Sequence, residues 1–186
     1  MTNRAGHDGT DFETGVRNYL AEVAGIDVRR EVKHGSRDEG DLRATVHGRR
    51  TVIECKRVER VTPKMLASYK LQTTVEVANA QADMGVLVMW RKGRGFRYDA
   101  SPTGSRAKSF GENVAWMTVE TLLRLGDARG DVEMATEVAE TWVSMALIDA
   151  ALLMRDCEVA EGAGRTAGRA TCYGERGSSY SRRRAP

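Results

Sequence analysis

The stretch DEGDLRATVHGRRTVIECKR, residues 38–57, decides which fold the sequence predicts. Residues 41–46 alternate loosely between apolar and polar side chains, and residues 51–55 form a run rich in β-branched side chains. The residues between them, 47–50, have the composition of a turn. Two such runs joined by a short turn predict a β-hairpin. An antiparallel hairpin of this length brings the start of its first strand beside the end of its second.

Three charged side chains fall where the two strands of this hairpin meet. Asp41 begins the first strand, and Glu54 and Lys56 lie near the end of the second. Residues i and i+2 of a strand share a face, so Glu54 and Lys56 point the same way while Cys55 points to the opposite side. Oxygen ligands suit Mg²⁺ or Mn²⁺, and a lysine beside such an ion can act on a water and stabilise charge on a phosphate. The hairpin therefore predicts a site for phosphodiester hydrolysis.

This arrangement of Asp41, Glu54 and Lys56 resembles the signature of the PD-(D/E)xK nuclease superfamily. That signature is an acidic residue, a spacer, and then Glu-x-Lys on the next strand. The resemblance covers approximately residues 10–125. It implies an α/β fold, with a restriction-endonuclease-like core whose mixed central β-sheet is flanked by helices.

Two further features make the chain most similar to the Holliday junction resolvases of this superfamily, including their phage members. Glu13 follows Phe12 at the start of the first expected helix, and Gln72 lies on a helix after the lysine. The resemblance implies that Glu13 could hold metal or water and that Gln72 points at the metal site. Two structural explanations compete: Glu13 also fits an N-terminal capping box, and glutamines are common on solvated helix faces. The tyrosine that often follows the family glutamine by four residues is Glu76 here.

The resemblance implies a Mg²⁺-dependent endonuclease that cuts DNA at four-way or other branched junctions, with Mn²⁺ as a substitute ion. Asp41 and Glu54 would ligate the metal together with the main-chain carbonyl of Cys55. Lys56 would act on the attacking water or on the developing phosphorane charge. Asp38 is a rival to Asp41 as the first ligand. Because two cuts resolve a junction and the chain holds one such constellation, a homodimer is expected.

Two other classes of function remain open at this point. One is a restriction-type or end-processing nuclease of the same fold, and the other is a noncatalytic DNA-binding or assembly protein that has kept the fold. The intact Asp, Glu and Lys trio argues against the noncatalytic class, since packing alone would not require it. The three histidines lack zinc-ligand spacing, and no complete glycine-rich phosphate loop occurs.

The remainder of the chain predicts helices and strands around the hairpin. Strands are expected at residues 26–32, 85–90 and 114–118, and helices at 11–24, 64–81, 119–125 and, as one long segment, 131–155. The continuous apolar run at 85–90 is typical of a buried central strand beside that of Glu54. The expected inward positions of the second helix are Met65, Leu66, Tyr69, Val75 and Ala78.

Three parts are expected along the chain. Residues 1–130 would form the nuclease core, residues 131–161 a C-terminal helix, and residues 162–186 a disordered basic tail. Residues 142–154 are apolar almost all round. Such a helix must be buried, so it would either pack across the core or form a homodimer interface.

Charge is unevenly distributed although the net charge is only +3. Six arginines and one glutamate give residues 162–186 a charge of +5, and residues 91–108 carry six basic side chains against one acidic one. Both segments could contact DNA phosphates. Alternatively, residues 162–186 could be a solubilising tail and residues 91–108 a solvated loop. Residues 131–161 hold eight acidic side chains against one basic one and would avoid DNA.

The composition argues against a membrane protein. The apolar share of 41% and the charged share of 30% are those of a soluble globular protein, and no run of 18 apolar residues occurs. The N-terminus is polar, and the three cysteines have neither paired nor metal-type spacing. The expectation is a cytoplasmic protein that binds DNA and no membrane.

Overall fold

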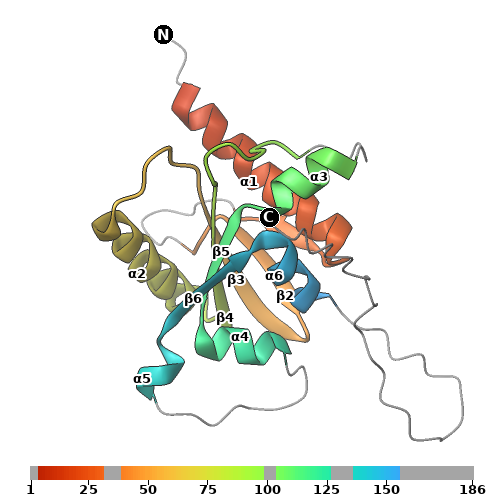
Figure 1. The fold of residues 1–186 in the computed structure, drawn as a ribbon. Helices are drawn as coiled ribbons and strands as arrows, with labels where there is room; N and C mark the ends of the chain where they lie inside the picture. The colour runs from red at the N-terminus through yellow and green to blue at the C-terminus, as the bar shows by residue number, and fades with distance from the viewer. Residues whose placement is uncertain (1–3, 32–38, 99–103, 127–135, 156–186) are drawn as a thin grey trace, which may run out of the picture.

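One mixed β-sheet with helices on both faces organises the described residues, 4–31, 39–98, 104–126 and 136–155 of this computed structural model (Figure 1). The strands are β1 (Val28–Arg30), β2 (Leu42–Val46), β3 (Arg49–Lys56), β4 (Met84–Met89), β5 (Val114–Thr118) and β6 (Trp142–Ala146). The helices are α1 (Arg4–Val23), α2 (Pro63–Asn79), α3 (Gly104–Gly111), α4 (Val119–Gly126), α5 (Thr136–Ala139) and α6 (Leu147–Met154). The predicted α/β class, with a mixed sheet flanked by helices, is confirmed.

The predicted hairpin forms β2 and β3. These strands pair in antiparallel register, with Leu42 opposite Ile53. His47 and Gly48 make the turn with φ angles of 49° and 75°. Positive φ at both central positions is typical of two-residue turns whose twist matches that of the strands. The two arginines that the sequence placed in the turn already pair in β3.

The strands follow one another across the sheet in chain order, from β1 to β6. β3 and β4 are parallel, with α2 as the connection between them, and all other neighbours are antiparallel. Every residue of β4 is buried, as predicted for a central strand. The carboxyl ends of β3 and β4 consequently meet at the same end of the sheet.

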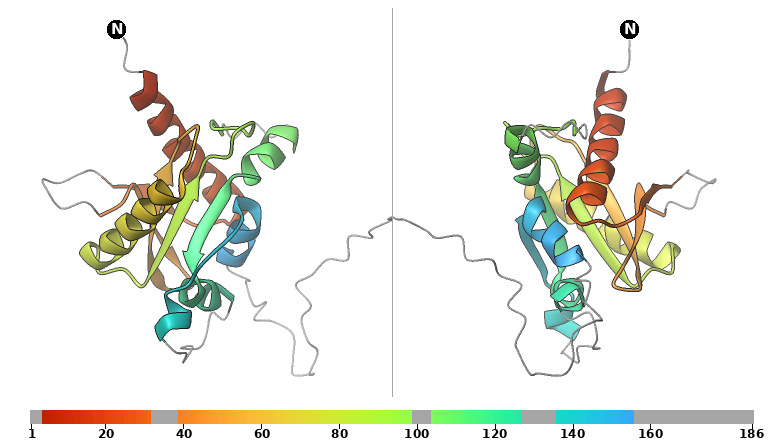
Figure 2. Two further views of the ribbon diagram at one scale, coloured as in Figure 1. Left: turned by 60° about the vertical axis from the view of Figure 1, so that its left-hand side comes forward. Right: turned by 90° about the vertical axis from the view of Figure 1, so that its right-hand side faces the viewer.

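The two faces of the sheet are covered differently (Figure 2). On one face, α1, α4 and α6 enclose the apolar core, with α3 against α1 and α6. On the opposite face, α2 packs on β3 and β4. In the left view of Figure 2, α2 lies in front of one half of the sheet, and no described helix lies in front of β5 and β6.

The long helix predicted over residues 131–155 is wrong. Within it, Trp142–Ala146 forms β6, which pairs with β5, and Leu147–Met154 forms the separate helix α6. An all-round apolar run suits a buried helix, but it suits equally well a strand and a short helix that share one core. Pairing with β5 decides between them, because β6 forms hydrogen bonds with the N–H and C=O groups along the outer edge of β5.

Most of the apolar C-terminal segment packs inside the chain. Four residues of α6 are fully buried in the core, namely Leu147, Ala150, Ala151 and Met154. Ile148 and Leu152, in contrast, remain exposed. Of the two alternatives for this segment, packing across the core therefore accounts for its buried side chains.

α1 and β1 differ from their predicted bounds. α1 begins at Arg4, so Thr10 and Glu13 lie inside the helix and the predicted capping box is wrong. The residues before Thr10 continue the helix, and α1 extends past the sheet at its N-terminal end (Figure 1). β1 pairs with β2 only over Val28–Arg30, which is shorter than the predicted strand.

α2 begins where its proline predicted and turns a polar side inward. The Thr62 hydroxyl caps the helix by accepting a hydrogen bond from the Met65 N–H at 3.2 Å. The predicted inward positions of Val75 and Ala78 are wrong, because both are exposed. The buried residues of α2 are instead Thr73 and Glu76. This helix covers the predicted site rather than the apolar core, so polar side chains occupy its inner face.

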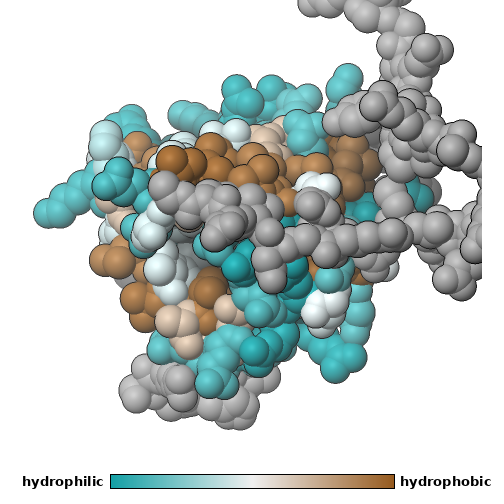
Figure 3. All heavy atoms as spheres, turned by 90° about the horizontal axis from the view of Figure 1, so that it is seen from below, coloured by the Kyte–Doolittle hydropathy of each residue, from teal (hydrophilic) through white to brown (hydrophobic). Residues whose placement is uncertain are grey.

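The outer surface mixes hydrophilic and apolar side chains (Figure 3). The large apolar side chains that remain exposed are Val61, Leu71, Val75, Leu123, Val138, Ile148 and Leu152. They are spread over several elements rather than gathered along one helix. Within the described residues, no helix combines the length and apolar character needed to cross a membrane.

Candidate active site at the end of the central hairpin

The backbone of β3 holds Asp41 in place. Asp41 Oδ2 accepts a hydrogen bond from the Cys55 N–H at 2.9 Å. The N–H and C=O of one strand residue point to the same edge of the strand, so the Cys55 carbonyl also faces the edge where Asp41 lies. The structure thus places the predicted Asp41 and Cys55 oxygens along one edge of β3.

Gly40 allows the chain to approach β3 closely just before Asp41. Its φ of 90° lies in the region that favours glycine, and a Cβ there would lie 2.6 Å from Val52 Cγ1. A larger residue would push the start of β2 away from β3. Gly40 therefore helps to position the Asp41 carboxylate.

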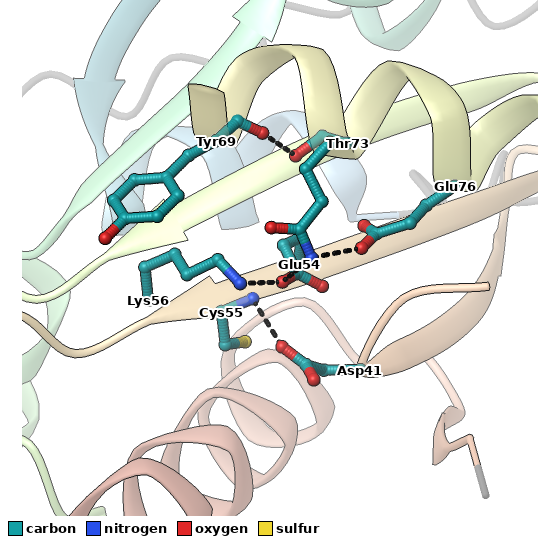
Figure 4. A network of polar contacts seen from close by, with 8 residues as sticks. Asp41, Glu54, Cys55, Lys56, Tyr69, Thr73 and Glu76 are labelled. Atoms are coloured by element: carbon teal, nitrogen blue, oxygen red, sulfur yellow. Dashed lines mark hydrogen bonds and ion pairs between the residues drawn. The ribbon is translucent and has the colours of Figure 1, made fainter. Parts of the chain in front are cut away.

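Glu54 is a buried carboxylate at the centre of the site, with only 2% of the residue exposed. Its Oε1 is paired with Lys56 Nζ and accepts a hydrogen bond from Gln72 Nε2 at 3.1 Å. Figure 4 shows Glu54 and Lys56 on β3 facing α2, with Asp41 directed at the Cys55 nitrogen. These contacts supply the partners that a buried carboxylate requires.

The polar face of α2 completes the site. Gln72 Nε2 also donates to Glu76 Oε1 at 2.7 Å, and Glu76 is only 1% exposed. The Lys56 ammonium lies 5.4 Å from the centroid of the Tyr69 ring. The structure brings Gln72 to Glu54. The sequence did not indicate that Glu76 belongs to this site, although its i, i+4 spacing from Gln72 puts both on one helix face.

The protonation of Glu54 and Lys56 reflects their burial and their mutual charge. Burial, and next the neighbouring Asp41 charge, raise the pKa of Glu54 to about 9, against the opposing influence of Lys56. Burial by itself would lower the pKa of Lys56, but the charge and hydrogen bond of Glu54, with Asp41, raise it above its ordinary value. Lys56 is therefore an ammonium at neutral pH, which can donate hydrogen bonds but cannot accept a proton.

Cys55 and Glu13 lie on the other side of β3. The Cys55 side chain belongs to the apolar core, and burial raises the pKa of its thiol, so only its backbone faces the site. The charge of Glu13 acts on that thiol in the same direction. The Glu13 carboxylate itself pairs with Arg30 Nη2 at 2.5 Å. Asp38, the rival of Asp41, lies outside the described residues.

The basic stretch at 91–108 follows β4 and so begins at the same end of the sheet as Lys56. Two of its arginines, Arg94 and Arg97, form ion pairs with acidic side chains at 2.7 Å and 2.6 Å. Arg91 and Lys92 are exposed. Among the basic side chains next to the end of β4, these two are the better placed to meet a phosphate. The basic tail at residues 162–186 lies outside the described residues.

In the part of the chain that the structure describes, no three His, Cys, Asp or Glu side chains group closely enough to hold a metal ion. Asp41 and Glu54 nevertheless fit Mg²⁺ chemically, because this ion is often held by one or two carboxylates while it keeps several waters. No protein-family model, curated protein or solved structure matches this chain.

Proposed function

We propose that this chain is a Mg²⁺-dependent endonuclease that hydrolyses DNA phosphodiester bonds at four-way or other branched junctions, within a restriction-endonuclease-like fold. The observation that carries the proposal is the convergence of Asp41, Glu54 and Lys56 at the end of the central hairpin. Packing gives no reason to bury Glu54 beside Asp41, since burial, and next the repulsion from Asp41, raise the pKa of Glu54 and disfavour its charged form. Residues that break the rules of stable packing are concentrated at functional sites.

The excess of carboxylates over cations at this site supports a divalent cation. Asp41, Glu54 and Glu76 all act on this site, and Lys56 is the cation paired with Glu54. Asp41, Glu54 and the Cys55 carbonyl would hold Mg²⁺, or Mn²⁺ in its place. When bound, such an ion supplies positive charge to the phosphate and makes a water more acidic.

The surrounding side chains have separate tasks. Lys56, an ammonium on the face of Glu54, donates hydrogen bonds and positive charge to a phosphate oxygen as negative charge develops there. Gln72 holds Glu54 by its amide and links it to Glu76, which fixes the orientation of the carboxylate. Arg91 and Lys92, exposed beyond β4, contact the DNA backbone farther from the cut.

The test is incubation of the purified chain with labelled linear, flapped and four-way DNA, in Mg²⁺, in Ca²⁺ and in chelator. Four-way DNA is expected to be cut fastest. Of the three conditions, only Mg²⁺ should support cutting, because Ca²⁺ takes a looser coordination and positions water and phosphate less well. Lys56→Ala is expected to cut at least ~100-fold more slowly. Glu59→Gln, a change of an exposed carboxylate soon after β3, is the control and should cut at the normal rate.

Each contrary result points to a specific alternative. Equal cutting of linear and four-way DNA would favour an end-processing or restriction-type nuclease. DNA binding without cutting in any metal would favour a noncatalytic DNA-binding protein. A monomer by light scattering, both free and on DNA, would refute the homodimer that two symmetric cuts require.

A further inference from the structure

Two tryptophans lie on the half of the sheet that α2 leaves uncovered. Trp116 on β5 and Trp142 on β6 are on this face, because Met117 and Val143, at the alternate positions, pack with the core on the other face. Both tryptophans are partly exposed. Ser144, the strand partner of Trp116, is exposed. This face therefore presents indole rings to the outside rather than to the core.

The strand register puts these rings in line with the candidate active site. Glu54 is the partner of Leu87, and Leu87 is the partner of Trp116. Neighbouring strands lie about 4.8 Å apart, so the backbones of Glu54 and Trp116 are about 10 Å apart along this row. This span is the length of one or two nucleotides, and because α2 packs on β3 and β4, a nucleic acid strand held at Glu54 would reach Trp116 by passing around this helix.

Lys70 of α2 lies over both rings. Its Nζ is 3.9 Å from the centroid of the Trp116 ring and 5.7 Å from that of Trp142. An ammonium in this position is attracted by the π-faces of the indoles, which are thus turned toward the α2 side. Aromatic faces with a nearby positive charge are what single-stranded nucleic acid binds, through stacked bases and paired phosphates.

We propose that Trp116, Trp142 and Lys70 form a binding site for an unpaired nucleobase and its phosphate, on the strand that is cut at Glu54. This inference rests on the proposed nuclease function for the identity of the strand. A base that stacks on the indoles takes the place of the Lys70 ammonium, which then pairs with the phosphate of the same nucleotide. An unpaired base enters such a site at a lower cost than a paired and stacked one. The site would thereby select DNA with a branch or an unpaired segment.

The test compares the affinities of the full chain for a short oligothymidylate and for an abasic oligomer of equal length, measured by fluorescence anisotropy. Measurement in Ca²⁺ separates binding from cutting. The oligothymidylate is expected to bind about tenfold more tightly, since the abasic oligomer keeps the phosphates and loses the stacking. Trp116→Leu and Trp142→Leu should each reduce this preference, and Trp116→Phe should keep most of it.

Two further variants separate stacking from charge. Lys70→Gln should keep the preference for bases while lowering the salt slope of binding by about one, because one phosphate contact is lost. Trp90→Phe is the matched control and should change neither quantity, because the Trp90 ring lies 5.1 Å from the Arg57 guanidinium and is not one of the two rings under Lys70. Thermal melting of each variant establishes that it is folded.

Equal affinity of the unaltered chain for the two oligomers would overturn the proposal. It would also be overturned if a folded Trp116→Leu or Trp142→Leu protein kept the full preference for the oligothymidylate. The same holds if these substitutions changed the oligomeric mass of the protein and left that preference unchanged. Failure of the nuclease proposal looks different. In that case no DNA is cut in Mg²⁺, while the preference for bases measured in Ca²⁺ remains.

Discussion

The two faces of the sheet differ in what they bury. The α1 face encloses an aromatic cluster in which the ring centroids of Tyr19 and Phe110 lie 5.3 Å apart and those of Phe12 and Phe110 lie 5.9 Å apart. The α2 face buries polar side chains instead, with Glu54 paired to Lys56. Apolar burial stabilises a fold, whereas burial of charge costs stability unless each charge is paired.

This contrast suggests a division of tasks between the faces. Apolar packing on the α1 face stabilises the fold. On the α2 face, carboxylates are held close together at a cost in stability. Substitutions on the α1 face should therefore alter the free energy of unfolding. Substitutions on the α2 face should alter activity, and some of them should make the chain more stable.

The largest effect is expected from Phe110→Ala on the α1 face. Phe110 is fully buried and contacts three other aromatic rings, so its loss should lower the free energy of unfolding by about 3–5 kcal/mol. Urea unfolding followed by circular dichroism measures this change. Leu71→Ala, a change at a residue that is 66% exposed, is the control and should cost about 0.5 kcal/mol or less. Similar decreases in the free energy of unfolding for both variants would contradict the contrast between the two faces.

Asp41→Asn should abolish most activity while leaving the fold intact. An asparagine keeps an oxygen that can accept the Cys55 N–H hydrogen bond, but it removes the negative charge that would hold a metal ion in the proposed nuclease. Cleavage in a single turnover should slow at least ~100-fold, with melting temperature nearly unchanged. Asp27→Asn, a change of an exposed aspartate, should leave both quantities as they are. A cleavage rate close to that of the unaltered chain would remove Asp41 from the site.

Glu54→Gln should make the metal-free chain more stable near neutral pH, by roughly 2 kcal/mol, because it removes a carboxylate that folding makes harder to ionise. The pKa of Glu54 is raised from 4.5 to about 9 on folding. Between these values the folded chain binds more protons than the unfolded chain. The stabilisation from a protonated Glu54 is therefore fully present below pH 4.5 and is lost as the pH rises toward about 9.

Thermal melting in chelator across this pH range tests the effect. The unaltered chain should lose stability with rising pH more steeply than Glu54→Gln does. Glu59→Gln should follow the unaltered chain, because Glu59 is exposed. Parallel pH curves for the unaltered chain and Glu54→Gln would show that Glu54 is ordinarily charged in the folded state.

Local patterns sufficed to predict much of the fold. The hairpin, the buried strand β4, and the elements β5 and α4 all follow from runs of apolar residues bounded by turns. The positions of Asp41, Glu54 and Lys56 follow as well, because a two-residue turn and strand alternation determine where these side chains lie. These features depend on residues that are close together in the sequence.

The features that escaped prediction depend on distant partners. Residues 142–146 form β6 only because β5 offers an edge for pairing, and an apolar run does not encode that choice. In the sequence, Glu76 was only a departure from a family pattern. Its burial could not be predicted, because it depends on Gln72 and on the approach of α2 to β3. The tryptophans of β5 and β6 come together only once the sheet order is known.

The smallest effect is expected from Gln72→Leu, and it would sharpen the assignment of α2 to the site. Leucine fills a similar volume but removes the amide that holds Glu54 and Glu76 together. Loss of a residue that orients a metal ligand commonly weakens metal affinity by about 10- to 100-fold, and the lower value is expected here because Lys56 still pairs with Glu54. A titration of cleavage rate against Mg²⁺ should therefore require about tenfold more ion for half-maximal activity, with nearly the same rate at saturation. Gln81→Leu, an exposed change beyond the end of α2, should leave the titration unchanged. A loss of saturated rate without a change in Mg²⁺ requirement would instead place Gln72 in contact with the reacting phosphate.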